Sequence, residues 1–422
     1  MQHRVQKLLS AGPLAGQFLL FLLFLILLLP EGRGTALAVP QAGQQQDDRV
    51  LRGALVEGIA MGLPGISAAI GTGDTLTWAG TAGWSDLPGR VPVEPGDRFG
   101  VGSITKTMAA RVVLQLVEEG VLDLEKTPTD YLDLEVVRRV PNTGKATLRQ
   151  LINHQSGIPT WEFQPDWIRK GRGAEMDLGR TWGKTETLHY CTADLLPATN
   201  EPGERYSYSN TNYTILGLII EAVTGNEACE EIRRRVLEPL GMRDTFLESF
   251  EEVPGGYVGH YHYATPRFQE TAGVHPAFRE IRPLLVESTK GNLSPEWTAG
   301  GMVSSAGDLV RWARAIRDGE LLGPAMQEEV FTWYPPDEDR RPGYRYLQGI
   351  AWTGDLHGGL DAYGHSGGTL GFTAYMYWFE GTDIIVVMLT NAGGMHSGLS
   401  PGPPGLFFRQ VWLSAVMRYL GR

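Results

Sequence analysis

The sequence predicts an α+β fold, in which an antiparallel sheet is built from both chain ends and flanked by helices. Short apolar stretches broken by glycines over residues 66–84 indicate early β structure. Strand signals return only near the end, where residues 372–379 alternate, 380–383 resemble a turn and 384–389 form a continuous apolar run. Between them, over about residues 122–319, helical segments alternate with Pro- and Gly-rich loops. We therefore expect one sheet from the two termini, with a mostly helical insertion.

Several helices are expected around this sheet. Residues 103–119 carry an apolar stripe at helical spacing, with Gly120 as the expected stop. Residues 406–420 form an apolar-faced closing helix. A further stripe precedes the first strand, at Val50, Leu51, Ala54, Leu55 and Ile59.

The first 38 residues are predicted to be a secretory signal. A basic start is followed by an uninterrupted apolar run over residues 18–29 and by the small-x-small site Ala36, Leu37, Ala38. The run is shorter than the roughly 20 residues of a membrane-spanning helix. We therefore expect a secreted protein, attached to a membrane only if the leader is not cleaved. Residues 39–48 are polar and are expected to be a flexible lead-in, followed by a body over residues 49–422.

Composition limits the function classes. With 42% apolar and 20% charged residues the chain is an ordinary folded protein. A net charge of −11 disfavours nucleic acid and anionic membrane surfaces as partners. The two cysteines, Cys191 and Cys229, lack zinc-ligand spacing. They form either a disulfide, if the protein is exported, or two separate buried thiols.

The first candidate site is Ser103 with Lys106. Positions i and i+3 of a helix are neighbours, so the lysine amine can reach the serine hydroxyl. A lysine whose pKa is lowered by burial can accept the serine proton and activate the nucleophile. Among the seven lysines, Lys106 alone has a serine three residues before it. The alternative is a helix N-cap serine with an exposed lysine.

Two later elements carry polar groups suited to the same chemistry. Tyr208 and Asn210 lie on a predicted loop before a helical stripe that ends at Gly225. A tyrosine hydroxyl can relay a proton, and an asparagine side chain can hold a substrate amide. His365, Ser366, Gly367 and Gly368 precede a predicted strand, where glycines let a ligand approach the backbone. Taken singly, each element also fits an ordinary polar turn.

Together these three elements resemble the penicillin-recognising serine enzymes: class C β-lactamases, secreted D-alanyl-D-alanine carboxypeptidases, and related carboxylesterases and D-aminopeptidases. That family carries SxxK, YxN and K/H-x-G in this order. Residues 151–157 (LINHQSG), 206–225 (YSYSNTNYTILGLIIEAVTG) and 299–308 (AGGMVSSAGD) are also similar. The resemblance covers about residues 50–420. It implies the β-lactamase/transpeptidase-like fold for the body.

The resemblance also implies roles for the site residues. Ser103 would be the nucleophile, Lys106 its proton acceptor, and Tyr208 a second acid/base. Asn210, His365, Ser366, Gly367 and Gly368 would contact the substrate, and the backbone N–H groups of Ser103 and Gly368 would form the oxyanion hole. An acyl-enzyme on Ser103 would transfer its acyl group to water or an amine. No metal or cofactor is implied, and we expect a monomer acting on a small peptide, ester or β-lactam, with peptidoglycan stem peptides included.

One departure bears on the substrate. Class C β-lactamases have lysine in the third element, whereas this chain has His365. The histidine is nearer to the His-Thr-Gly of Streptomyces-type carboxypeptidases. A partly charged histidine binds a carboxylate less strongly than lysine does. The expected activity is therefore D-alanyl-D-alanine carboxypeptidase-like, with a carboxylesterase, a β-lactamase or a non-catalytic penicillin-binding sensor of the same fold as alternatives.

A rival nucleophile lies in the third element itself. Residues 364–368 fit G-x-S-x-G, the nucleophile elbow of α/β-hydrolases, with Asp383 and His396 following in order. An elbow requires an apolar strand before it and a helix after it, whereas polar residues 355–363 precede and a strand pattern follows. The sequence therefore favours Ser103 over Ser366.

Histidines and tryptophans of the inserted region complete the candidates. His260 and His262 lack a carboxylate at ligand spacing and are expected on a surface or cleft edge rather than at a metal site. The tryptophans are predicted either to line the cleft or to pack within the insertion: Trp161, Trp167 and Trp182.

Overall fold

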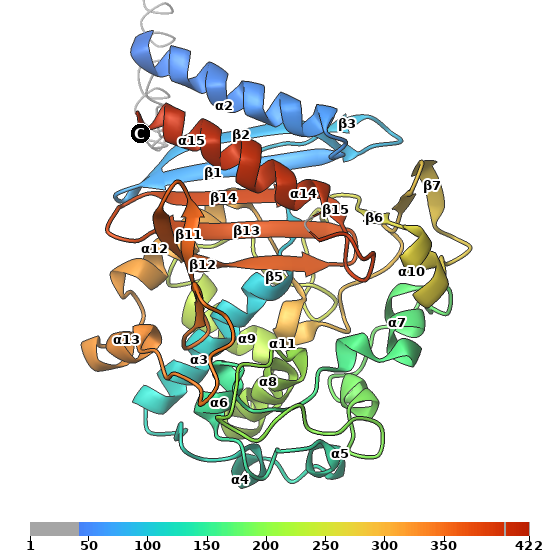
Figure 1. Cartoon of the computed structure of the whole chain (residues 1–422), viewed down its shortest axis with the longest axis vertical. Coiled ribbons are helices and arrows are strands. Elements are labelled where there is room, and N and C mark those ends of the chain that lie inside the picture. Colours follow the sequence, from blue (N-terminus) through green and yellow to red (C-terminus); the bar gives the residue numbers. More distant parts are fainter. Residues whose placement is uncertain (1–41, 401, 422) are drawn as a thin grey trace, which may run out of the picture. The chain divides into compact units, whose positions relative to one another are not determined.

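The computed structural model describes residues 42–400 and 402–421, so the predicted signal segment lies outside the described residues. The main sheet has eight strands in the order β10-β11-β12-β13-β14-β1-β2-β3, and every neighbouring pair is antiparallel (Figure 1). Its strands are β1 (Gly65–Thr72), β2 (Thr75–Asp86), β3 (Val91–Pro92), β10 (Tyr344–Tyr346), β11 (Ala351–His357), β12 (Leu360–Thr369), β13 (Phe372–Phe379) and β14 (Ile385–Thr390).

The two chain ends meet at the centre of this sheet. Strand β1 pairs with β14, placing Ile66 opposite Thr390 and Gly71 opposite Ile385. Both strands are almost entirely buried, because helices cover both faces of the sheet. Such strands have continuous apolar sequences rather than alternating ones. The predicted α+β fold, with its sheet built from both termini, is confirmed.

Helices cover each face of the sheet. On one face, α2 (Ala42–Ala60) and the closing segments α14 (Pro403–Leu406), η6 (Phe407–Trp412) and α15 (Leu413–Tyr419) share a core that includes Leu51, Ile66 and Trp412. On the other face, α12 (Ala306–Asp318) packs against β1, β13 and β14. Helix α12 begins after Ser305, whose side chain accepts the Asp308 N–H, and ends at left-handed Gly319.

The lead-in is helical where the structure describes it. Helix α2 begins at Ala42, and the flexibility expected for residues 39–48 stays a prediction. Asp48 is held at 2.7 Å from the Arg52 Nε and accepts a hydrogen bond from the Trp78 indole. These contacts favour the helical conformation of a polar segment that shows no apolar periodicity.

The helices over residues 105–331, a stretch that includes the inserted region, are mostly short and lie around the long α8. They are α3 (Thr105–Glu118), α4 (Pro128–Tyr131), α5 (Glu135–Arg139), α6 (Leu148–Ile152), α7 (Pro165–Arg172), α8 (Asn210–Thr224), α9 (Ala228–Ile232), α10 (Pro266–Thr271), α11 (Trp297–Gly300) and α13 (Pro324–Phe331), with turns η3 (Trp161–Phe163), η4 (Glu186–Tyr190) and η5 (Arg233–Leu237). None of the helices in the described ranges has the length and apolar character needed to span a bilayer.

Two small sheets, formed partly by strands of the inserted region, were not predicted. One has the order β15-β6-β8-β7 and the other β4-β9-β5. Strands of two to four residues are too short to show an alternating pattern. Their bounds are β4 (Phe99–Gly100), β5 (Phe246–Leu247), β6 (Tyr261–Tyr263), β7 (Arg279–Arg282), β8 (Leu285–Glu287), β9 (Met302–Ser304) and β15 (Ala392–Gly393).

The cysteines are two separate thiols. Cys191 and Cys229 are both free and buried, so the disulfide alternative is wrong. The Cys191 thiol donates to the Leu188 carbonyl at 3.3 Å, and the Cys229 thiol donates to the Phe250 carbonyl at 3.7 Å. Burial raises the pKa of both thiols, to about 12 and about 11, which makes them poor nucleophiles.

The histidines and tryptophans of the insertion are packing residues. His260 and His262 are fully buried, so the expected surface position is wrong. His262 lies in β6 and His260 directly precedes it, and burial lowers both pKa values to about 3 and keeps the rings neutral. The tryptophans are buried in the hydrophobic core, which selects packing over the cleft wall: Trp161, Trp167 and Trp182.

Candidate active site

Ser103 lies in a single 3₁₀ turn, η2 (Gly102–Ile104), that leads into α3. The α-helix proper begins at Thr105, two residues later than predicted, and the spacing of Ser103 and Lys106 is preserved. The Lys106 ammonium donates hydrogen bonds to the Ser103 Oγ at 3.0 Å and to the Ala299 carbonyl. The lysine is therefore a buried partner of the serine and not an exposed helix residue.

Burial changes the acidity of Lys106. The side chain has no exposed surface, and this desolvation lowers its pKa to about 7, against an opposing influence from the Glu162 carboxylate. Since the charged form of a buried amine is destabilised, a large share of Lys106 is neutral near pH 7. A neutral amine beside the Ser103 hydroxyl can accept its proton.

Tyr208 completes the environment of the serine oxygen. Its hydroxyl donates to the Ser103 Oγ at 2.8 Å. Burial raises the pKa of Tyr208 well above its usual value of 10, although the hydrogen bond from Tyr208 to Ser103 opposes the shift. The phenol therefore keeps its proton at neutral pH. The site pairs one group that accepts a proton, Lys106, with one that donates, Tyr208.

His154 supports the tyrosine from behind and was not identified from the sequence. Its ring lies 4.1 Å from the Tyr208 ring, and its Nδ1 accepts the Ser209 N–H at 3.2 Å. Burial, with Lys106 nearby, lowers its pKa well below 6.5, so the ring is neutral. The stretch 151–157 contains it, but its spacing indicated no contact with residues 208–209.

Asn210 contacts a carboxylate that sequence reasoning missed. Its Nδ2 donates to Glu162, and its Oδ1 has no protein partner. Glu162 lines the same cleft as Ser103, whereas Asn210 does not line it. Burial raises the pKa of Glu162, while Lys106 and Arg172 oppose that shift. The contact of Asn210 with substrate stays a prediction.

His365 contributes a neutral ring to the strand wall. It lies within β12, where its Nε2 and the Tyr346 hydroxyl are 2.9 Å apart. Burial, together with the charge of Lys106, lowers the pKa of His365 to about 3. The expected partial positive charge is therefore absent near pH 7, and the ring offers hydrogen bonding only.

The glycines of β12 let its backbone approach the nucleophile. A Cβ at Gly367 would clash with the Val101 carbonyl, and a Cβ at Gly102 would lie 2.6 Å from the Gly368 nitrogen. Gly102 has φ +51°, a conformation that favours glycine. Strand β11 pairs with β12 only over residues 360–364, which leaves the edge of residues 365–369 free of β11. The backbone of Gly368 thus faces the turn that carries Ser103.

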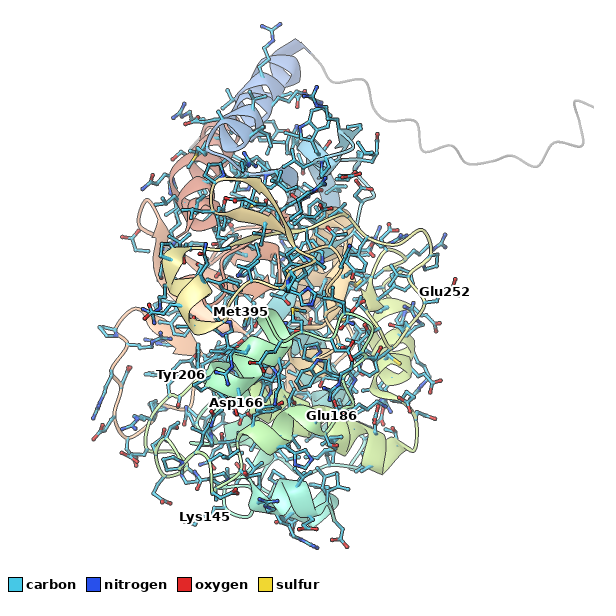
Figure 2. The ribbon with its side chains drawn as sticks, turned by 90° about the vertical axis from the view of Figure 1, so that its right-hand side faces the viewer. Lys145, Asp166, Glu186, Tyr206, Glu252 and Met395 are labelled. Atoms are coloured by element: carbon cyan, nitrogen blue, oxygen red, sulfur yellow. The ribbon has the colours of Figure 1, made fainter. Side chains whose placement is uncertain are left out.

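Several of the site residues line one cleft, whose volume is about 610 Å³. Ser103, Glu162, Tyr208 and residues 365–368 line it. Tyr206 and Met395, which are labelled in Figure 2, also line it. The remaining walls are aromatic, apolar and cationic: Tyr263, Arg341, Tyr344, Thr373, Tyr375, Tyr377, Gly394, Leu399, Ser400, Gly402, Pro404, Gly405 and Arg409.

The nucleophile-elbow alternative is wrong. Residues 364–368 lie inside strand β12 and not at a strand-to-helix turn. Ser366 points to the face of the sheet opposite His365, beside Tyr375 across the ladder. Across the described ranges, no group of three or more His, Cys, Asp or Glu side chains is arranged to hold a metal ion.

Comparison with known proteins decides the family. The model of the family described as Beta-lactamase matches residues 48–401. The chain belongs to the Beta-lactamase family. With the Ser103 geometry, it is a serine hydrolase of the β-lactamase fold, as the sequence resemblance implied.

Three relatives define the likeness. Unguisins hydrolase ungD of Aspergillus violaceofuscus is 26% identical over 78% of this chain and 58% of its own length. The chain thus spans less than two thirds of that relative. A D-stereospecific amidohydrolase from Streptomyces sp. is 28% identical with a TM-score of 0.69, covering 88% of this chain and 99% of the other. D-amino acid amidase from Ochrobactrum anthropi SV3, complexed with D-phenylalanine, is 25% identical with a TM-score of 0.73, covering 89% and 98%.

Proposed function

We propose that this protein is a serine amidase or peptidase that cleaves amides of D-amino acids carrying a free α-amino group, through an acyl-enzyme on Ser103. The observation that carries the substrate class is the Glu162 carboxylate, which lines the cleft together with Ser103. The α-ammonium of an aminoacyl substrate is one carbon from the carbonyl that Ser103 attacks. A carboxylate near the nucleophile is the group that would bind it.

The proposed mechanism follows from the protonation states. Neutral Lys106 accepts the Ser103 proton as Oγ attacks the carbonyl carbon. The N–H groups of Ser103 and Gly368 stabilise the oxyanion that develops. Tyr208, protonated at neutral pH, passes a proton to the departing amine, and Lys106 restores it. Water then attacks the acyl-enzyme, and Lys106 accepts a proton from the water. Lys106 returns this proton to the Ser103 Oγ as the carboxylic acid leaves.

The stereochemistry rests on relatives. One of the solved proteins is named a D-stereospecific amidohydrolase and another a D-amino acid amidase, and this chain aligns with almost the whole length of each. Asn210 acts indirectly, because its Nδ2 donates to Glu162 while Asn210 itself does not line the cleft. An ammonium donates three hydrogen bonds, and the carboxylate oxygens of Glu162 can accept from it.

The second candidate is the D-alanyl-D-alanine carboxypeptidase expected from the sequence. It requires a cation for the terminal carboxylate, and neutral His365 does not supply one near pH 7. Arg341 and Arg409 are exposed cations on the cleft wall, and they favour this candidate. An esterase, a β-lactamase or a non-catalytic penicillin-binding sensor would use the same residues. Secretion and a monomeric state remain predictions.

The test compares free and blocked amines. D-phenylalaninamide and its N-acetyl derivative would be assayed with wild type and with Glu162→Gln. We expect wild type to prefer the free amine, and Glu162→Gln to lose about tenfold to a hundredfold in kcat/KM on that substrate alone, as for a lost charged partner. Equal losses on both substrates would contradict recognition of the ammonium by Glu162.

The same assays separate the alternatives. Turnover of an N-acylated peptide ending in D-alanyl-D-alanine, with none of the free-amine amide, would select the carboxypeptidase. Incubation with a fluorescent penicillin, followed by mass spectrometry, would report acylation of the Ser103 peptide. Acylation without product release from any substrate would select the sensor.

A further inference from the structure

The inner end of β12 is held by a buried side-chain hydrogen bond. Thr369 follows Gly368 directly and has no exposed surface. Its hydroxyl donates to a Glu296 carboxylate oxygen at 2.9 Å. Thr369 is also the last β12 residue in register with β13, opposite Phe372. The Thr369 hydrogen bond thus lies one residue after Gly368, whose N–H is proposed to line the oxyanion hole.

Glu296 is buried beside an arginine that pairs with it. Glu296 is 2% exposed and Arg172 is fully buried, and the two form an ion pair. Arg172 also lies 4.9 Å from the Trp167 ring and donates to the Gly171 carbonyl at 2.8 Å. A carboxylate at this depth needs a paired cation, and hydrogen bonds to a charged acceptor are stronger than neutral ones. The carboxylate that accepts the Thr369 hydroxyl is therefore itself paired with a buried cation.

Glu296 is also linked to Lys106 through hydrogen bonds of its backbone. Its backbone carbonyl accepts the Ala299 N–H at 2.7 Å in the turn that forms α11. The Ala299 carbonyl in turn accepts a hydrogen bond from the Lys106 ammonium. Glu296 is thus connected through its side chain to the strand wall and through its backbone to Lys106.

We propose that Thr369 is a positioning residue: its hydrogen bond to the buried Glu296–Arg172 pair sets the distance between the Gly368 N–H and Ser103. The proposal rests on the proposed function, in which that N–H stabilises the oxyanion. Thr369 touches no substrate in this role. It acts through the backbone of its neighbour, and an error of about 1 Å at such a donor costs about a hundredfold in rate.

The test uses two substitutions that differ in the hydroxyl. Thr369→Val keeps the shape and removes the donor, whereas Thr369→Ser keeps the donor and removes a methyl group. Both would be prepared in the full chain and assayed for kcat and KM on the preferred amide. We expect Thr369→Val to lose about tenfold to a hundredfold in kcat with KM nearly unchanged, and Thr369→Ser to stay within about threefold of wild type.

A double-mutant cycle checks the partner. If the hydrogen bond acts through Glu296, Glu296→Gln in the Thr369→Val background should cost less than it costs in wild type. Additive losses would overturn the proposed coupling. Thermal unfolding of each variant reports stability, and a kcat loss that only follows the melting temperature, with Thr369→Ser no better than Thr369→Val, would assign Thr369 a structural role alone.

A phosphonylating serine probe separates this inference from the proposed function. Such a probe forms a tetrahedral adduct on an activated serine and places an oxygen in the oxyanion hole. Slower labelling of Ser103 in Thr369→Val supports the proposal. Equal labelling rates in Thr369→Val and wild type would overturn the positioning role while leaving the hydrolase intact. No labelling of wild type would overturn the proposed function itself.

Discussion

The two walls of the cleft contribute different parts of the chemistry. The helical wall carries reactive side chains, since Lys106 and Tyr208 both hydrogen-bond to the Ser103 oxygen. The strand wall carries backbone, because Gly367 and Gly368 bring β12 against the turn of Ser103. His365 in that wall is neutral. We therefore expect that removing a side chain from the helical wall lowers the rate of turnover. On the strand wall, adding a side chain should lower that rate.

The largest effect is expected at the nucleophile. Ser103→Ala should reduce kcat/KM by at least about 10⁴-fold, because no other group on the helical wall can form the acyl-enzyme. Turnover would be followed with the preferred amide, and acylation by mass spectrometry. A variant with more than a tenth of wild-type activity would show that the reaction does not pass through Ser103.

Loss of the base should come next. Lys106→Ala should lower kcat about 10²- to 10⁴-fold, the usual range for a general base. In wild type, kcat/KM should rise as the pH passes about 7, because the Lys106 pKa is lowered to that value and only the neutral amine accepts a proton.

The matched control for that pH profile is His365→Asn. His365 has a pKa of about 3 and is already neutral across the range, so the rise near pH 7 should persist in this variant. Disappearance of the rise in His365→Asn, with its persistence in Lys106→Ala, would reverse the assignment of the base.

The strand wall is tested by adding a methyl group. Gly367→Ala should lower kcat about 10²-fold or more, because its Cβ would push β12 away from the Val101 carbonyl and misplace the oxyanion donor. Gly368→Ala is the matched control: its Cβ meets no heavy atom within 4 Å and its N–H is kept, so its loss should be below about tenfold. Equal losses in the two variants would point to blocked substrate access.

The smallest effect is expected at the second serine. Ser366→Ala should change kcat/KM by no more than about twofold, the consequence of about 0.5 kcal/mol at an exposed position. Steady-state kinetics on the same amide would measure it. A loss comparable to that of Ser103→Ala would place reactive chemistry on the strand wall and break the comparison.

Local patterns predicted the parts of the fold that depend on local sequence. The strand pattern over residues 372–389 corresponds to β13 and β14, and Gly120 and Gly225 stand where α3 and α8 end. The short strands of the two small sheets were missed, since two to four residues form no pattern. The helical conformation of α2 from Ala42 was not expected, because polar composition is compatible with a helix as well as with a loop.

The residues of the candidate site also fall into those that local sequence predicted and those that it did not. Ser103 and Lys106 could be paired from their spacing alone, because i and i+3 of a helix are always neighbours. Glu162, His154 and Thr369 could not be recognised as part of the site, since their partners lie 48, 55 and 73 residues away in the chain.

By itself, the sequence determined the order of the elements, the helix that pairs serine with lysine and the resemblance that led to the family. Only the tertiary structure decided the charges: burial lowers the pKa of Lys106 to about 7 and that of His365 to about 3. It also placed a carboxylate, Glu162, in the cleft that holds the nucleophile. The physical reason is that spacing along a helix is a local property, whereas desolvation and electrostatic pairing depend on segments that meet only in the folded chain.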